Sequence, residues 1–232
     1  MGLLVYALIV FIFRSQRRAI LLSSLLAAPQ ALFALYLVPR YWNPRLIAEF
    51  SIGLEDILFT FICGGMAWVE ASWLLRRRII LQIKPSLIMA RLLAGGIFAL
   101  GLFVLLARVG IGNMLNPLII MGIWILTLLL LRRSLWPFAA LAAVQSFVLY
   151  TFTLAAMKFL WPAFFMFWAW KNLSGINLWG IPLEEIAWGI LYGPFWGTTM
   201  AYLLEAKLTQ KSDITQVDVS CADASRNRPD SA

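Results

Sequence analysis

The feature that most constrains the fold of this 232-residue chain is a series of long apolar runs joined by short polar connections. Soluble domains contain about 45–50% apolar and about 25% charged residues, whereas this sequence contains 62% and 13%. These proportions exclude a soluble or disordered protein and predict an all-α integral membrane protein with seven transmembrane helices. The expected helices are Met1–Phe13, Ala19–Val38, Leu54–Leu75, Leu87–Ala107, Pro117–Leu131, Leu135–Met157 and Leu183–Leu204.

The lengths of the runs and the charges between them support this topology. Five runs are about 20 residues long, enough to cross a hydrocarbon layer of about 30 Å, whereas the first and fifth need flanking residues or packing inside a bundle. Because lysine and arginine gather in cytoplasmic loops, we expect the amino terminus outside and the carboxyl terminus in the cytoplasm. The residues on the cytoplasmic side are Arg14, Arg17, Arg18, Arg76, Arg77, Arg78, Lys84, Arg91, Arg132, Arg133, Lys207 and Lys211, against Arg40, Arg45, Arg108, Lys158 and Lys171 outside.

The composition also restricts the chemistry. The chain has no histidine and two cysteines, so it cannot form a Ser-His-Asp triad, a Cys-His pair or a histidine metal site. Any acid–base reaction must use carboxylates, tyrosine, lysine or water. We expect no metal and no cofactor, and we read the formal charge of +8 as a topology signal, not as a sign of nucleic-acid binding.

The sequence contains an internal repeat in three ordered features. Arg17-Arg18 recurs as Arg132-Arg133, the segment ending in Gln30 recurs in the one ending in Gln145, and Gly53-Leu54-Glu55-Asp56 recurs as Pro182-Leu183-Glu184-Glu185. We therefore predict two three-helix repeats joined by a linking helix. The expected divisions are a first unit at 1–78, the linking helix and its loops at 79–115, a second unit at 116–207 and a disordered cytoplasmic tail at 208–232.

The two acidic pairs are the strongest candidates for a site. Glu55 with Asp56, and Glu184 with Glu185, each open a long apolar run, and ionisable groups at membrane depth usually have a function. The alternative is capping, because a helix start favours carboxylates. Of the other acids before the tail, Glu49 is expected in an outer loop, whereas Glu70 and Glu205 are expected near the cytoplasmic ends of their helices and paired with arginine or lysine.

The helix faces that follow the acids are aromatic. Helical spacing places Trp188 and Tyr192 after Glu184 and Glu185, and Phe59 after Glu55 and Asp56. Aromatic rings can stabilise a carbocation, so these rings, with Gln30 and Gln145 from the repeat, are the candidate substrate-binding residues. Plain packing is the alternative for the rings, as it is for the four-spaced glycines of the last helix, Gly189, Gly193 and Gly197.

The duplicated motif Pro182-Leu183-Glu184-Glu185 resembles the lycopene cyclase domain family, which includes bacterial heterodimeric lycopene β-cyclases and the cyclase half of a fungal fused enzyme. The resemblance implies acid-initiated cyclisation of a polyene end to a β-ionone ring without net redox change, in a bacterial plasma membrane. It implies catalytic roles for Glu55, Asp56, Glu184 and Glu185, with Gly53 and Pro182 as structural motif residues. The first unit departs from the pattern, having glycine for proline and aspartate for glutamate.

Other functions compete with this hypothesis. A retinal protein needs a lysine within its last helix, and Leu183–Leu204 contains none. A lipid- or isoprenoid-binding scaffold and a proton-coupled transporter both stay open. The expected partners are an apolar polyene or isoprenoid and membrane lipids, with homo- or hetero-oligomers left open. We expect both acidic pairs to converge on one chamber lined by rings, and the aromatic clusters Tyr41-Trp42 and Trp161–Trp179 to form an interfacial belt.

Overall fold

The computed structural model describes residues 2–43, 52–76, 78–112 and 114–209, and this part of the chain is mainly helical. The eight α-helices are α1 (Gly2–Ile12), α2 (Arg17–Ala27), α3 (Ala34–Leu37), α4 (Leu54–Ser72), α5 (Pro85–Arg108), α6 (Leu115–Leu131), α7 (Trp136–Leu160) and α8 (Leu183–Leu203). Two short antiparallel pairs accompany them, β1 (Ile79–Ile80) with β4 (Lys207–Leu208) and β2 (Asn177–Leu178) with β3 (Ile181–Pro182).

The prediction of an all-helical membrane protein is confirmed at this level. Four helical segments have the length and composition to cross a membrane: Arg14–Leu37, Leu54–Leu75, Pro85–Arg108 and Arg133–Leu160. Gly2–Ile12 and Leu115–Leu131 are shorter apolar helices. The predicted helix Ala19–Val38 is divided into α2, a 3₁₀ segment at Ala28–Phe33 and α3, since Pro29 lacks the amide hydrogen that a regular α-helix uses.

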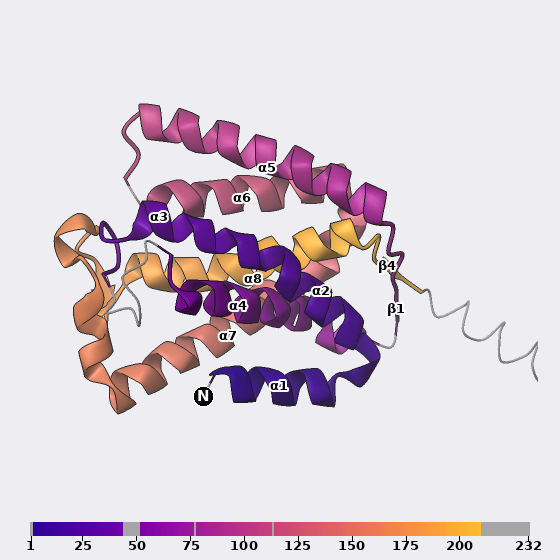
Figure 1. Ribbon diagram of the computed structural model, residues 1–232, viewed down its shortest axis with the longest axis horizontal. Coiled ribbons are helices and arrows are strands. Elements are labelled where there is room, and N and C mark those ends of the chain that lie inside the picture. The colour runs from indigo at the N-terminus through magenta and orange to yellow at the C-terminus, as the bar shows by residue number, and fades with distance from the viewer. Residues whose placement is uncertain (1, 44–51, 77, 113, 210–232) are drawn as a thin grey trace, which may run out of the picture.

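The helices lie roughly along the long axis of the molecule, with α8 in the middle (Figure 1). α8 packs against α4, α6 and α7. Its glycines permit this: a Cβ on Gly189 would lie 1.8 Å from the Tyr150 ring, and one on Gly197 would lie 2.7 Å from the carbonyl oxygen of Ala67. The glycine stripe therefore serves close helix packing, as the simpler interpretation predicted.

The two ends of the molecule differ. The α1–α2 turn, β1 and β4 lie at one end, and the segment between α7 and α8 lies at the other (Figure 1). At the first end, Ile79 pairs with Leu208. Leu208 therefore belongs to the folded part of the chain, whereas the rest of the predicted tail from residue 210 lies outside the described residues.

Glu205 fastens the carboxyl end of α8 to two other helices. It has a left-handed backbone (φ 50°), and the Ala206 amide donates to the Ala201 carbonyl at 2.9 Å, which is a Schellman-type helix end. Its carboxylate lies 2.5 Å from Arg91 and 3.4 Å from Arg132, so the predicted pairing with basic residues is confirmed. The Arg91 hydrogen bond lowers the pKa of Glu205.

Candidate functional site

The start of α8 is set by the short hairpin before it. Trp179 and Gly180 both have positive φ, at 53° and 75°, and join β2 to β3 in two residues, as tight hairpin turns require. Pro182 ends β3 with an extended backbone, and α8 begins at Leu183. The two predicted acids, Glu184 and Glu185, thus lie in the first turn of the central helix.

Glu185 is the centre of a hydrogen-bond network. The hydroxyls of Tyr41 and Tyr150 donate to its two carboxyl oxygens, and the Trp168 indole nitrogen donates at 3.3 Å. These three donors come from the loop after α3, from α7 and from the segment before α8. Glu185 is therefore positioned by three separate parts of the chain.

Tyr41 is positioned by backbone pairing between distant segments. Its carbonyl accepts from the Ala169 amide at 2.9 Å, Trp42 forms a β-bridge with Trp168, and Asn43 donates to the Phe167 carbonyl at 2.8 Å. Burial, together with the charge of Glu185, raises the pKa of Tyr41. The Tyr41 hydroxyl therefore keeps its proton and remains a donor to Glu185.

The aromatic segment before α8 is not only an interfacial belt. Phe165 and Trp168 are 3% and 4% exposed, and Trp42 contacts the Trp168 ring edge-on at 5.4 Å. Trp161 and Trp179 are exposed, as a belt predicts. The belt interpretation therefore fits the exposed rings, whereas Phe165 and Trp168 pack inside the protein and Trp168 contacts Glu185.

Glu184 has one bonded and one unbonded oxygen. Its Oε1 accepts the Ser174 amide at 2.6 Å, and the residue is 6% exposed. Its Oε2 is buried without a hydrogen-bond partner in the described part of the chain. A buried polar atom without a hydrogen bond lowers the stability of a fold by about 1–3 kcal/mol. Glu184, next to Glu185 in the sequence, therefore occupies an energetically unfavourable position.

The first acidic pair has a different environment. Asp56 accepts the Gly53 amide at 2.9 Å, and the Asp56 amide in turn donates to the Gly53 carbonyl at 3.2 Å. Asp56 therefore caps its own helix, as the alternative reading predicted. Glu55 is half-buried one residue earlier. Gly53 has the extended backbone that Pro182 has before α8.

The predicted substrate-binding rings do come together. Phe59 of α4 stacks on Trp188 of α8 with centroids 5.8 Å apart, and Trp188 stacks on Tyr192 at 4.7 Å. Tyr150 lies 5.6 Å from Trp188 and so connects this ring stack, defined as Phe59, Trp188 and Tyr192, to Glu185. Tyr192 donates to Gln30 at 3.1 Å.

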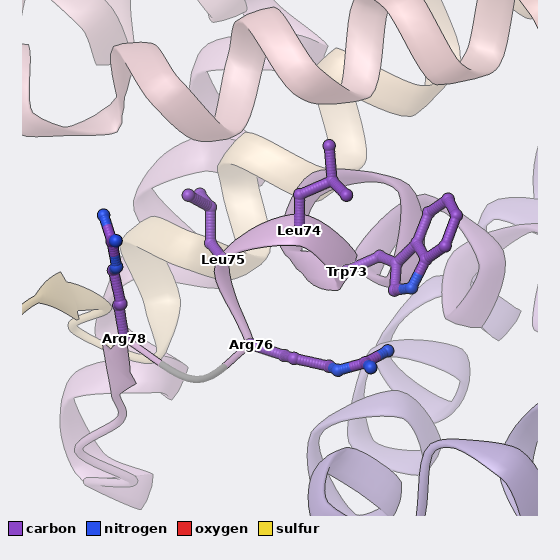
Figure 2. Close-up of a pocket in the computed structure, with 5 residues that line it drawn as sticks. All are labelled: Trp73, Leu74, Leu75, Arg76 and Arg78. Atoms are coloured by element: carbon purple, nitrogen blue, oxygen red, sulfur yellow. The ribbon is translucent and has the colours of Figure 1, made fainter.

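Two expectations about the ring-lined region need adjustment. The rings contact one another directly. A cavity of about 560 Å³ lies away from them, beside the turn that follows α4 (Figure 2). Gln145 differs from its repeat partner Gln30, because its side-chain nitrogen is buried without a hydrogen-bond partner in the described part of the chain.

A partly buried acid, Glu70, was assigned wrongly from the sequence. Glu70 was expected to pair with a cation, but it accepts a hydrogen bond from Ser146 at 2.5 Å. A Cβ on Gly193 would lie 2.5 Å from its Oε2, so the acid lies at the interface of α4, α7 and α8. Ser146 and Tyr150 are one helical turn apart on α7 and serve Glu70 and Glu185 respectively.

The residues that contact Glu185 and Glu70 could hardly be predicted from the sequence. The glycines at four-residue spacing on α8 predicted close approach, but not that Tyr150 and Ser146 fill those positions. Tyr41 and Trp168 lie in segments that we expected to form the interfacial aromatic belt. Among the described residues there is no group of three histidine, cysteine or acidic side chains that could hold a metal ion.

Comparisons with protein-family models, curated proteins and solved structures find no match to this chain. The resemblance to the lycopene cyclase domain family therefore depends on the motif residues alone.

Proposed function

We propose that this chain is a membrane-embedded isoprenoid cyclase of the lycopene cyclase type. The observation that carries the proposal is the junction of an acid with a ring stack. Glu185 accepts a hydrogen bond from Tyr150, and the Tyr150 ring contacts the Trp188 ring. Trp188 in turn stacks on both Phe59 and Tyr192. A proton donor beside aromatic faces is the arrangement that protonation of an alkene requires.

The proposal includes the finer topology predicted from the sequence. The chain would cross the membrane seven times as two three-helix repeats and a linking helix, with its amino terminus outside. The positions of its helices support this, since helical segments occupy all seven apolar runs. In this orientation the acids at the start of α8 lie toward the outer side.

In the proposed reaction, the Glu185 carboxyl adds its proton to a terminal carbon–carbon double bond of the polyene, leaving a tertiary cation. A second double bond attacks this cation and closes the six-membered ring. A neighbouring carbon then loses a proton to the Glu185 carboxylate, which restores the acid. Atoms and electrons balance, so the product is an isomer of the substrate and no redox cofactor takes part.

The substrate would reach the rings from the bilayer. Phe59 is 52% exposed, and its neighbour Ile57 is 42% exposed on the same helix. An apolar chain could therefore contact the stack laterally and separate Phe59 from Trp188. Tyr41, Tyr150 and Trp168 would hold Glu185 in place, and Glu184 would hold the Ser174 loop.

The test is expression in a lycopene-accumulating bacterium, with pigments separated by chromatography. Cyclic carotenoids are expected with the unchanged sequence and are expected to disappear with Glu184→Gln plus Glu185→Gln. Glu205→Gln is the control, because it removes a carboxylate at the other end of the molecule. Unchanged lycopene from well-inserted protein would overturn the carotenoid assignment.

A proton-coupled transporter is the second candidate, and the Glu70–Ser146 pair favours it. Two partly buried carboxylates, each accepting a hydrogen bond from a hydroxyl of α7, resemble part of a proton path. The two functions separate in detergent: a cyclase works there without a gradient, whereas a transporter needs a sealed vesicle and loses uptake when an ionophore removes the gradient.

A further inference from the structure

The cavity beside the end of α4 has an apolar wall and a basic rim. Its lining residues are Trp73, Leu74, Leu75, Arg76 and Arg78, and its volume is about 560 Å³. Figure 2 shows the Arg76 side chain extending below the Trp73 indole, with Arg78 on the other side of the turn. Trp73 and Leu74 are 44% and 64% exposed. The site thus offers cations and uncovered apolar surface together.

The cavity lies where the chain leaves the membrane. Leu54–Leu75 is one of the four candidate spans, so Trp73, Leu74 and Leu75 are its last residues and Arg76 follows directly. Tryptophan and arginine are typical of the headgroup region of a bilayer. This depth favours a lipid over a solute from the water phase.

The α1–α2 turn, which is also basic, lies beside the turn that follows α4. Gln16, in the α1–α2 turn, accepts a hydrogen bond from Ser72 at 2.7 Å, and the Arg76 guanidinium lies 5.6 Å from the Phe13 ring centre. These contacts bring the segment that carries three more exposed arginines next to the cavity. The basic corner, as we name it, comprises Arg14, Arg17, Arg18, Arg76 and Arg78.

The charge of the basic corner is not neutralised by the described acids. The ion pairs found in the described part of the chain join Glu205 to Arg91 and Arg132, which belong to other helices. Five arginines that form no ion pair with the described carboxylates repel one another and attract an anion. An anion bound here would therefore stabilise the end of the helix bundle.

We propose that the basic corner and its cavity bind the headgroup of an anionic phospholipid. Arg76 and Arg78 would contact the phosphate, and Trp73 and Leu74 would contact the glycerol and upper acyl chain. Arginine suits a phosphate because its guanidinium presents two donors side by side. The proposal concerns a face remote from Glu185 and does not depend on the cyclase function.

The test measures lipid retention by native mass spectrometry of the full chain purified in a neutral detergent. Phosphatidylglycerol is titrated against phosphatidylcholine of the same chain length. A basic residue near an anionic lipid surface contributes about 1 kcal/mol, or about fivefold in affinity. Arg76→Gln plus Arg78→Gln is therefore expected to weaken phosphatidylglycerol binding by about 25-fold.

The matched control is Arg108→Gln plus Lys171→Gln, which removes two exposed charges outside the basic corner and should leave binding unchanged. A second pair of variants tests the apolar contact with the lipid. Trp73→Ala should weaken phosphatidylglycerol binding, whereas Trp179→Ala, at a residue that is 82% exposed, should not. Equal retention of the two lipids, equal losses in variant and control, or displacement of the lipid by millimolar inorganic phosphate would each overturn the proposal.

Discussion

The starts of α4 and α8 have nearly the same sequence pattern and very different surroundings. At α4, Asp56 turns back to the amide of Gly53 three residues earlier. At α8, Glu185 accepts from Tyr41, Tyr150 and Trp168, of which Tyr41 is 144 residues away. The first acid serves its own helix, and the second connects three segments of the chain.

The difference arises in the segments around each motif. Before α8 stand Trp168 and Ser174, which donate hydrogen bonds to Glu185 and Glu184. The repeat predicted from the sequence would require about 14 additional residues in this region, because the motif offset rises from 115 to 129. A repeated motif therefore does not imply a repeated site. Helix capping and a catalytic role competed as explanations for both acidic pairs. In our proposal capping explains the pair at α4, and the catalytic role belongs to the pair at α8.

The largest expected effect tests this division directly. Glu185→Gln should lower cyclisation by about 10²–10⁴-fold, because it removes the proposed proton donor. Asp56→Asn should change the rate by less than about threefold, since an amide oxygen can still cap a helix. Pigment yield per inserted protein measures both. Similar losses in the two variants would remove the proposed distinction.

Removal of one tyrosine donor should have the next largest effect. Tyr150→Phe deletes a hydrogen bond that would stabilise the Glu185 carboxylate formed when the acid gives up its proton, and bonds to charged groups contribute about 1.5–3 kcal/mol. This corresponds to a loss of roughly 10–100-fold in rate. Tyr6→Phe is the control, because Tyr6 bonds to Ser24 away from the acid. A normal rate in Tyr150→Phe would mean that Glu185 is positioned without it.

Packing at α8 gives a third prediction. Gly189→Ala should destabilise the fold by about 1–3 kcal/mol, as overpacked interiors do, because the new Cβ would overlap the Tyr150 ring. Gly96→Ala in α5 meets nothing within 4 Å and should be neutral or stabilise by up to about 1 kcal/mol. Thermal unfolding in detergent compares them, and a stable Gly189→Ala protein would contradict the tight α7–α8 contact.

The helix cap at α4 should show in stability and not in rate. Asp56→Ala removes the bond to Gly53 and should cost about 1 kcal/mol. Thermal unfolding in the same detergent measures this loss. Cyclisation by the protein that stays folded should be preserved. A rate lost without a change in stability would show that Asp56 takes part in the chemistry.

The smallest effect concerns pH at the other end of α8. Because the folded pKa of Glu205 is lowered by Arg91, its contribution to stability is present above the unfolded value of about 4.3. It is lost as pH falls through the lower folded value. Unfolding temperatures measured from pH 7 to pH 3 should therefore fall less in Glu205→Gln than in the unchanged protein.

Periodicity and composition predicted the helices well, because apolar runs must be helical in a membrane. They also singled out Phe59, Trp188 and Tyr192, since these rings follow the acids at helical spacing, and the repeated segment singled out Gln30. They did not predict Tyr41, Trp168 or Ser146 as partners, because those contacts depend on how distant segments meet. Glu70 was assigned wrongly because position along a helix does not reveal which neighbour faces it.

The assembly of Glu185 from three segments has a consequence for biogenesis. Tyr41 is synthesised early, Tyr150 much later, and the acid itself belongs to the last helix of the described chain. Until that helix enters the membrane, the two tyrosines lack their common acceptor. The complete network is therefore a signature of finished insertion, and a protein truncated before α8 would hold its tyrosines without the group they serve.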